Sequence, residues 1–348
     1  MLPDLQILRG PYLQDILQQP AALGRTLDGL SPSPALNKLV DRIRGKQFSR
    51  IVLTGMGASF HALHPFNLQL IQQGYTALMV ETSELLHYQE SFIDSQTLMV
   101  TVSQSGRSAE IVRLLEVNQR RAAIIAITNT AESLLARKSD AAVVTSAGDE
   151  FSVSCKTYVC ALLALEWLGG LLRSDADLNP KELSIAARAA ASYLEHWEEH
   201  VRGLASRLNG VRHLFLVGRG PSLASAGTGA LIIKESTHFH AEGMSSAAFR
   251  HGPLEMVNGE TLVLAFLGDP RTAGLNRRLV EDICQRQASA ELVSPESSEP
   301  ALRLPSVPQS MSPILEILPV QMVTLALAAL AGREPGRFAL ASKVTTTE

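Results

Sequence analysis

A short glycine-serine pattern occurs twice at a fixed separation, and this repeat limits the possible folds more than any other feature. Gly55-Met56-Gly57-Ala58-Ser59 returns as Gly218-Arg219-Gly220-Pro221-Ser222, 163 positions later. The run 97–100 (TLMV) is matched by 261–264 (TLVL), 164 positions later. Two near-equal offsets indicate an internal duplication. The sequence therefore predicts two copies of one structural module.

The pattern within each copy is typical of parallel α/β structure. Near-continuous apolar runs, expected in strands buried on both faces, occur at 51–54, 76–80, 97–102, 122–127 and 141–145. Helical patterns lie between them, and 156–172 is apolar almost all round. A second α/β series starts at His213. We expect two flavodoxin-like parallel-sheet modules related by duplication.

The domain division follows from these patterns and from the length of 348 residues, which exceeds what one core usually supports. We expect an N-terminal helical segment at 1–45, a phosphate-binding module at 46–178 and a second module with the C-terminal tail at 211–348. The charged pattern of 180–207 predicts an inter-domain helix within 179–210. The apolar stretch 314–331 contains Glu316, Pro319 and Gln321, so we expect a buried helix beginning near the proline and no membrane span.

The composition argues against several classes of binding partner and cellular location. Lys and Arg number 31 against 34 Asp and Glu, so no basic surface for nucleic acid or membrane is expected. Three cysteines cannot all pair and none lies in a C-x-x-C motif, which favours a cytoplasmic protein without disulfides or zinc. The N-terminus has no pattern of a signal peptide.

A hydroxyl-rich loop is the strongest candidate for a binding site. Ser103-Gln104-Ser105-Gly106-Arg107-Ser108 lies between an expected strand and the following helix, where backbone N-H groups and hydroxyls favour an anion such as a phosphomonoester. A plain N-cap serine is the alternative. Ser59 adds a donor at the same sheet edge. The second copy has Leu267-Gly268-Asp269-Pro270 instead, so one phosphate site per chain is expected.

Two competing motifs are weaker. Gly55-x-Gly57, with Glu81 after the next strand, could open a dinucleotide site, but Phe60 replaces the third glycine of that motif. His196 and His200 are spaced i, i+4 without the glutamate of H-E-x-x-H, so we expect a solvated helix face rather than a metal site. No metal and no cofactor are predicted.

The second half supplies titratable groups suited to proton transfer: Lys234, Glu235, His238, His240, Glu242, Arg250 and His251. Aldose-ketose interconversion needs a carboxylate to move a carbon-bound proton and a histidine to move a hydroxyl proton. Each of these residues could equally be a core histidine or a surface acid. Lys343, five residues from the end, could be part of a frayed tail.

The residues together resemble the sugar isomerase (SIS) domain family, in particular the tandem-SIS isomerase half of glucosamine-6-phosphate synthases and the SIS-type amino-sugar-phosphate deaminases. The resemblance covers 45–348 and has these landmarks in order: Gly57-Ala58-Ser59, Ser103-Gln104-Ser105-Gly106, Ser154-Cys155-Lys156, Lys234-Glu235, His240-Ala241-Glu242, His251-Gly252-Pro253 and the tail from Lys343 to Glu348.

The resemblance implies a role for each matching residue. Glu235 would move a proton between C1 and C2, His251 would open the sugar ring from a neighbouring subunit, and Lys343 would bind the open-chain carbonyl. The other matches imply substrate contacts: Ser154 would bind sugar hydroxyls, and Gly57 is a further substrate-binding position. The matches to phosphate-binding residues are Ser59, Ser103, Gln104, Ser105 and Ser108. A homodimer with a shared active site follows from these roles.

Two departures from the synthases favour deamination over synthesis. Residue 2 is Leu and no glutaminase domain precedes the modules, so glutamine is not the expected nitrogen source, and Ile232 replaces a lysine one turn before Glu235. We expect conversion of glucosamine 6-phosphate to fructose 6-phosphate and ammonia. Alternatives are a galactosamine-6-phosphate deaminase, a fructosamine-6-phosphate deglycase and a ketose-aldose phosphosugar isomerase. A sugar-phosphate sensor is the non-enzyme alternative, although 1–45 is too short and too weakly basic for a helix-turn-helix domain.

Overall fold

The computed structural model describes residues 4–173, 180–286, 288–340, 342–345 and 347. The chain divides into two compact units. The first unit contains Ala21–Glu150, Lys156–Ser184 and Leu340–Glu348, and the second contains Met1–Pro20, Phe151–Cys155 and Ile185–Ala339. The chain passes between the units more than once, and its C-terminal tail belongs to the first unit.

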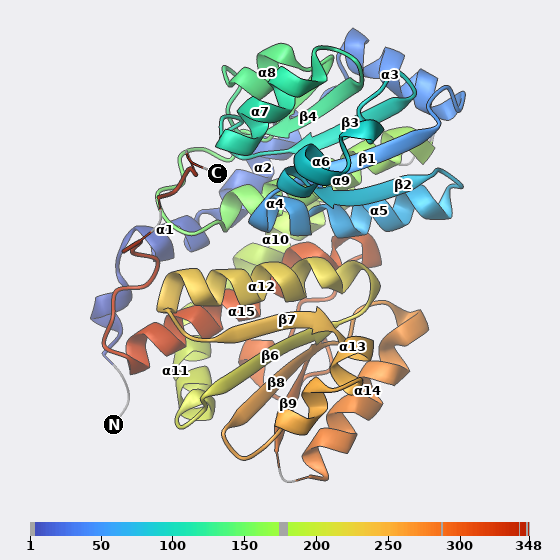
Figure 1. The fold of residues 1–348 in the computed structure, drawn as a ribbon. Coiled ribbons are helices and arrows are strands. Elements are labelled where there is room, and N and C mark those ends of the chain that lie inside the picture. The colour runs from blue at the N-terminus through green and yellow to red at the C-terminus, as the bar shows by residue number, and fades with distance from the viewer. Residues whose placement is uncertain (1–3, 174–179, 287, 341, 346, 348) are drawn as a thin grey trace. The chain divides into compact units, whose positions relative to one another are not determined.

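The first unit is built around a parallel sheet with the strand order β2-β1-β3-β4-β5, which is the flavodoxin-like order. Helices α6, α7 and α8 cover one face of this sheet, and α3, α5 and α9 cover the other (Figure 1). The strands are β1 Arg50–Gly55, β2 Ala77–Glu81, β3 Thr97–Val102, β4 Ala123–Thr128 and β5 Ala141–Val144. The helices are α2 Gln19–Gly29, α3 Pro34–Arg44, α4 Gly57–His61, α5 Leu63–Gln72, α6 Thr82–Tyr88, η2 Glu90–Phe92, α7 Ala109–Asn118, α8 Leu134–Lys138 and α9 Lys156–Arg173.

The second unit repeats this plan with the strand order β7-β6-β8-β9. Helices α13 and α14 pack on one face, and α12 contacts β6 and β7 and packs on α15. The strands are β6 His213–Gly218, β7 Ala241–Ser245, β8 Thr261–Phe266 and β9 Ser289–Val293. The helices are η1 Leu5–Leu8, α1 Pro11–Leu17, α10 Pro180–Leu194, α11 Trp197–Leu208, η3 Gly220–Ser222, α12 Leu223–Thr237, α13 Ser246–Arg250, η4 Pro253–Met256, α14 Pro270–Cys284, η5 Pro300–Leu302, η6 Gln309–Met311 and α15 Ser312–Leu330.

The two sheets confirm the predicted fold class. In each unit the first strand lies between the second and the third, and all the described strand pairs are parallel. Strands β1 and β6 begin 163 positions apart, and β3 and β8 begin 164 apart, which are the offsets of the sequence repeat. Both β3 and β8 are buried at every position, because helices cover both faces of a parallel sheet.

The charged segment 180–207 differs from the single helix predicted. It forms two helices, since α10 ends at Leu194 and α11 begins at Trp197. The prediction of a solvated face was also wrong for His200, which is buried and packs on the Tyr193 ring with centroids 4.4 Å apart. Charge periodicity did not reveal this aromatic contact, because an imidazole can bury its ring as readily as expose it.

Helix α15 begins earlier than predicted. It starts at Ser312 with Pro313 in its first turn, and Pro319 lies inside the helix rather than near its start. A proline costs one backbone hydrogen bond there, which the burial of almost every α15 residue offsets. By length and composition Gln309–Leu330 could cross a membrane, but 94% of that window is buried inside the structure, as in a core helix.

Candidate active site

The hydroxyl-rich loop connects β3 to α7 at the carboxyl edge of the first sheet. Ser103 and Ser105 are both buried, with 7% of their surface exposed. The Ser103 hydroxyl accepts a hydrogen bond from the Gly106 backbone N-H at 3.1 Å. The Gln104 carbonyl accepts from the backbone N-H of Asn129 at 3.1 Å. These bonds hold the loop in a defined turn at the amino end of α7.

Gly106 and Ser108 show why this turn is suited to an anion. Gly106 has a φ of +59°, and a Cβ atom there would lie 2.4 Å from the Ser133 hydroxyl, so a side chain would not fit. Ser108 has the extended backbone of an N-cap residue, but its side chain makes no capping hydrogen bond. The plain N-cap alternative is therefore wrong for Ser108, whose half-buried hydroxyl lies at a helix amino end.

Ser59 lies beside this loop because β1 and β3 are neighbours. Gly57, with a φ of +53°, begins the short helix α4 that carries Ser59. A Cβ atom at Gly55 would lie 2.9 Å from the Val102 carbonyl oxygen, so glycine lets the ends of β1 and β3 come together. The predicted phosphate-binding residues of both loops thus lie at one edge of one sheet.

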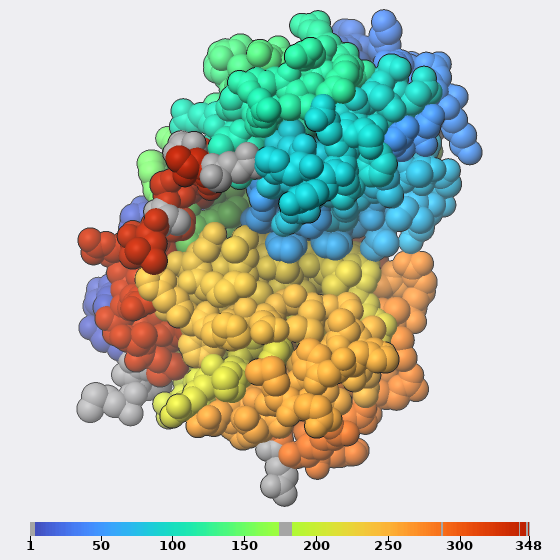
Figure 2. All heavy atoms as spheres, in the orientation of Figure 1, coloured from blue at the N-terminus to red at the C-terminus, as the bar shows by residue number. Residues whose placement is uncertain are grey.

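The C-terminal tail reaches the same edge of the first unit. The Lys343 amine lies 2.6 Å from a carboxylate oxygen of Glu150, and the Ala109 N-H at the start of α7 donates to the Thr345 carbonyl at 3.1 Å. The described tail residues are coloured at the red end of the bar in Figure 2 and lie on the molecular surface. Lys343 and Thr345 are thus held in the first unit, with Thr345 at the amino end of α7 directly after the serine-rich loop, so this described part of the tail is not frayed.

Glu150 is a site residue that the sequence did not indicate. Its side chain is fully buried, and it accepts hydrogen bonds from the Thr157 N-H at 3.0 Å and the Thr157 hydroxyl at 2.7 Å. Burial alone would raise the pKa of Glu150, but the Lys343 ammonium and the Thr157 hydrogen bonds lower it below its ordinary value. The carboxylate is therefore charged near neutral pH and fixes the position of the Lys343 amine.

Glu235 lies in the last turn of α12, in the second unit. The next two carbonyls accept hydrogen bonds from the segment after α15: Ser236 from the Gly336 N-H at 3.0 Å, and Thr237 from Arg333 at 3.1 Å. Glu235 is half-buried, and the end of α12 that carries it is held by these hydrogen bonds from the segment after α15. Ile232, one turn earlier, is completely buried, so an apolar core contact occupies the position where the resemblance implied a lysine.

His251 does not lie near Glu235 within the unit. Helix α12, which carries Glu235, packs on α15, whereas α13, which directly precedes His251, packs with α14 on the other face of the sheet. His251 is exposed. Ser154 is half-buried and precedes α9, in the short segment Phe151–Cys155. The predicted residues therefore fall into two groups, with the phosphate-binding residues and Lys343 in the first unit.

Comparison with known proteins supports the resemblance. The SIS domain family matches residues 46–169 and 207–331. The glutamine–fructose-6-phosphate aminotransferase (isomerizing) of Pyrococcus horikoshii is 30% identical over 353 residues, which cover 97% of this chain and 57% of that protein. The chain thus spans little more than half the length of this relative.

Solved structures share the fold over nearly the whole chain. The C-terminal domain of glucosamine-fructose-6-phosphate aminotransferase from Francisella tularensis has a TM-score of 0.80 at 21% identity, covering 97% of this chain and 98% of its own. Tagatose-6-phosphate ketose/aldose isomerase from Escherichia coli has a TM-score of 0.83 at 20% identity, covering 96% of each chain. Glucosamine-6-phosphate deaminase from Thermotoga maritima has 0.79 at 18%, covering 97% and 100%.

Proposed function

Because the chain belongs to the SIS domain family, we propose that it is a phosphosugar isomerase, and more narrowly an amino-sugar-phosphate deaminase that converts glucosamine 6-phosphate to fructose 6-phosphate and ammonia. The contact between Lys343 and Glu150, in the unit that holds the serine-rich loop, carries this proposal. An amine held by a buried carboxylate is suited to binding the carbonyl of an open-chain sugar whose phosphate occupies the loop.

The proposed chemistry is a proton shift followed by hydrolysis. His251 moves a proton between the ring oxygen and O1, which opens the pyranose to an aldehyde. Glu235 takes the C2 proton and returns it to C1 while the amine loses a proton and O1 gains one, so the 2-amino aldehyde becomes a 1-hydroxy ketimine. Water adds to C2 of the ketimine, the C-N bond breaks, and ammonia and the ketone remain. These steps need proton transfer by side chains and no change of oxidation state overall.

The buried Ile232 supports deamination rather than amination. A lysine at this position would place a second cation one turn from Glu235, whereas Ile232 has no exposed surface and packs in the core of the second unit. Release of ammonia does not require that cation, because the leaving nitrogen is already on the substrate.

The separation of Glu235 from His251 supports a homodimer with a shared active site. The helices that carry Glu235 and precede His251 pack on different faces of the second sheet, so His251 of one chain would serve the site that contains Glu235 of another. An exposed position suits a residue that acts in a neighbouring copy. A cytoplasmic location, expected from the cysteine content, stays a prediction.

The function is tested by incubating the purified protein with glucosamine 6-phosphate, galactosamine 6-phosphate, a fructosamine 6-phosphate and tagatose 6-phosphate while measuring ammonia and ketose. We expect ammonia and fructose 6-phosphate in equal amounts from glucosamine 6-phosphate, and no glutamate from added glutamine. Isomerisation of a neutral ketose phosphate without ammonia release would instead establish a ketose-aldose isomerase. Binding of sugar phosphates without any turnover would favour a sensor.

A Ser105→Ala variant is expected to bind glucosamine 6-phosphate about ten- to a hundred-fold more weakly, because a hydrogen bond to a charged phosphate is lost. Folding should change little, because Ser105 makes one long hydrogen bond in the loop, 3.4 Å from the Arg107 N-H. Calorimetric titration measures the affinity. The matched control outside the loop is Ser139→Ala, at the carboxyl end of α8. Equal binding of glucosamine and its 6-phosphate by the wild-type protein would contradict the phosphate assignment.

A further inference from the structure

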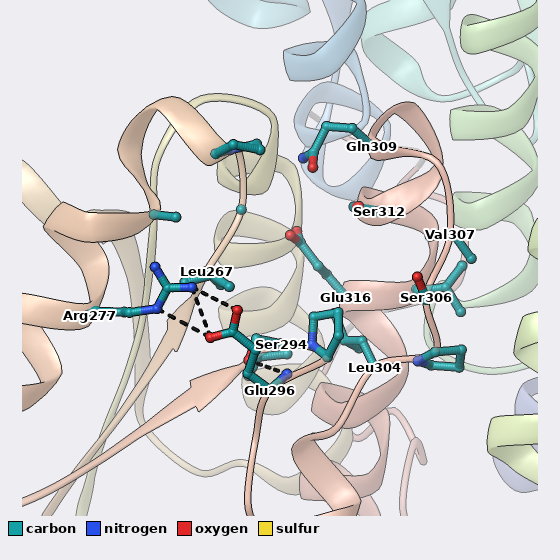
Figure 3. A pocket seen from close by; sticks show the side chains of 17 residues that line it. Leu267, Arg277, Ser294, Glu296, Leu304, Ser306, Val307, Gln309, Ser312 and Glu316 are labelled. Atoms are coloured by element: carbon teal, nitrogen blue, oxygen red, sulfur yellow. Dashed lines mark hydrogen bonds and ion pairs between the residues drawn. The ribbon is translucent and has the colours of Figure 1, made fainter.

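The second unit contains a cavity that the phosphate-binding role does not explain. The cavity has a volume of about 380 Å³ and lies at the carboxyl ends of β8 and β9. Its walls come from the β8–α14 loop, α14, the loop after β9 and the start of α15 (Figure 3). Ligand pockets in proteins typically have volumes of about 300–1,000 Å³. The cavity is therefore large enough for a ligand with a single six-membered ring.

The cavity occupies the position in the second copy that the phosphate loop occupies in the first. Gly268 lies 164 positions after Gln104, and Ser222 lies 163 positions after Ser59. Gly268 lines the cavity, and a Cβ atom on it would lie 2.7 Å from the Ser222 hydroxyl. The duplicated module has therefore kept an open space at this sheet edge although its serine-rich loop is gone.

The chemistry of this second space excludes a phosphate ligand. Asp269, at the position equivalent to Ser105, already places a carboxylate at the amino end of α14, where it accepts from the Arg271 N-H at 2.8 Å. Hydrogen bonds from Arg271 lower the pKa of Asp269, so this carboxylate is ionised. Arg277, which lines the cavity, is paired with Glu296 at 2.8 Å. Asp269 therefore already occupies the anion position at the amino end of α14, and Arg277 is already paired with Glu296. Among the described residues that line it, the cavity has no free cationic group for a phosphate.

A buried carboxyl group in the wall, Glu316, is the feature that points to a ligand. Glu316 on α15 has 1% of its surface exposed and points toward the cavity (Figure 3). Its Oε1 accepts from the Ser222 hydroxyl at 2.7 Å, whereas its buried Oε2 has no hydrogen-bond partner among the described residues. Leaving a buried acceptor unsatisfied costs free energy. A ligand with a donor group would satisfy it.

We propose that this cavity is a second ligand site, which takes a small ring-sized molecule with a primary amine and no phosphate, and that Glu316 Oε2 accepts a hydrogen bond from the ammonium group. Apolar walls such as Leu267, Val293 and Leu315 suit the carbon ring, and Gln309 and Ser312 can bind hydroxyl groups. The site is distinct from the serine-rich loop because it lies wholly in the second unit.

The pH dependence of binding follows from the burial of Glu316. Burial raises the pKa of Glu316 to about 7, and the Ser222 hydroxyl that donates to Oε1 opposes this rise. Among the residues that line the cavity, the charged groups besides Glu316 are Arg277 and Glu296, which pair with each other. An ammonium group binds the ionised form of Glu316, so amine affinity should rise between about pH 6 and about pH 8.

A matched pair of probes tests the site: trans-4-aminocyclohexanol and trans-1,4-cyclohexanediol, which differ in one amine. Calorimetric titration should show the amine binding at least about tenfold more tightly than the diol, as expected for a charge-assisted hydrogen bond. Glu316→Gln keeps the side-chain volume and should remove this preference. Glu296→Gln, which removes an equal charge in a paired group at the rim, should keep it.

Ser306→Trp is a second variant, on an exposed lining residue, that should block the cavity and abolish binding of both probes without a change in the core. The proposal is overturned if the wild-type protein binds neither probe or binds both equally. It is also overturned if Ser306→Trp leaves amine binding unchanged, or if a folded Glu316→Gln keeps the amine preference. None of these outcomes depends on turnover, so the test is independent of the proposed function.

Discussion

A Glu235→Gln variant is expected to fold and to bind glucosamine 6-phosphate, but to turn it over about a hundred- to ten-thousand-fold more slowly, because a positioned general base is lost. Glutamine has nearly the same volume and helix propensity as glutamate. The carbonyls of Ser236 and Thr237 keep their hydrogen bonds to Gly336 and Arg333, so the helix end should stay in place. Steady-state rates and circular dichroism separate the two effects.

Solvent exchange gives a sharper measurement of the same role. In heavy water the wild-type protein should place deuterium on C1 of the product or on C2 of recovered substrate, and Glu235→Gln should do neither. Lys234→Gln, at the exposed neighbouring position, is the matched control and should exchange normally. Exchange and turnover at wild-type rates in Glu235→Gln would show that another group is the base.

Mixing two inactive variants tests the proposed shared site. Chains with Glu235→Gln and chains with His251→Ala should each be nearly inactive alone. If His251 acts in a neighbouring copy, a mixed dimer contains one site in which both residues are intact. Activity should therefore return after the two variants are unfolded and refolded together. Failure to regain activity in dimers shown to be mixed would mean that both residues act within one chain.

The sheets and their connections could be predicted from the sequence because their signals are local. The β3 segment 97–102 was predicted with the bounds it has in the structure, since a strand buried on both faces is a near-continuous apolar run. The loop from Ser103 to Ser108 was placed correctly between β3 and α7 for the same reason. The fixed offset between the copies then predicted the second sheet.

Contacts between residues far apart in the sequence could not be predicted in this way. Glu150 and Lys343 are 193 positions apart, and neither lies in a periodic pattern that indicates burial. A buried acid such as Glu150 has the same residue type as a solvated one, and its environment distinguishes them. The sequence shows Glu316 only as an interruption of an apolar helix, whereas the structure places it in the wall of a cavity. The loss of the serine-rich loop in the second copy suggested no site there, because sequence comparison does not reveal empty space.

A Lys343→Met variant is expected to lose turnover by about a hundred- to a thousand-fold, because methionine removes the charge and the amine that would bind the developing charge at the sugar carbonyl. The methionine side chain has a length similar to that of lysine. If the amine forms an imine, borohydride added during turnover should attach the sugar to wild-type Lys343, detected by peptide mass, and leave Lys343→Met unlabelled. Lys138→Met, on the exposed end of α8, is the matched control.

Lys343→Arg distinguishes a covalent role from an electrostatic one. Arginine keeps a cation beside Glu150 but cannot form an imine. Turnover near the wild-type rate in Lys343→Arg, without borohydride labelling, would mean that the lysine acts through its charge. Turnover near the wild-type rate in Lys343→Met would contradict any catalytic role for the tail.

The same variant should change the pH dependence of stability through Glu150. In the wild-type protein the pKa of Glu150 lies below its ordinary value of 4.5, because Lys343 and Thr157 outweigh burial. The stability from this pair is therefore fully present above about pH 4.5 and is lost as the pH falls through the folded pKa. In Lys343→Met, burial is no longer opposed by the ammonium, so the pKa of Glu150 should rise.

Urea unfolding should show the Lys343→Met variant less stable than the wild-type protein at neutral pH, with a difference that shrinks below about pH 4. A constant difference across this range would mean that Glu150 and Lys343 are not coupled in solution.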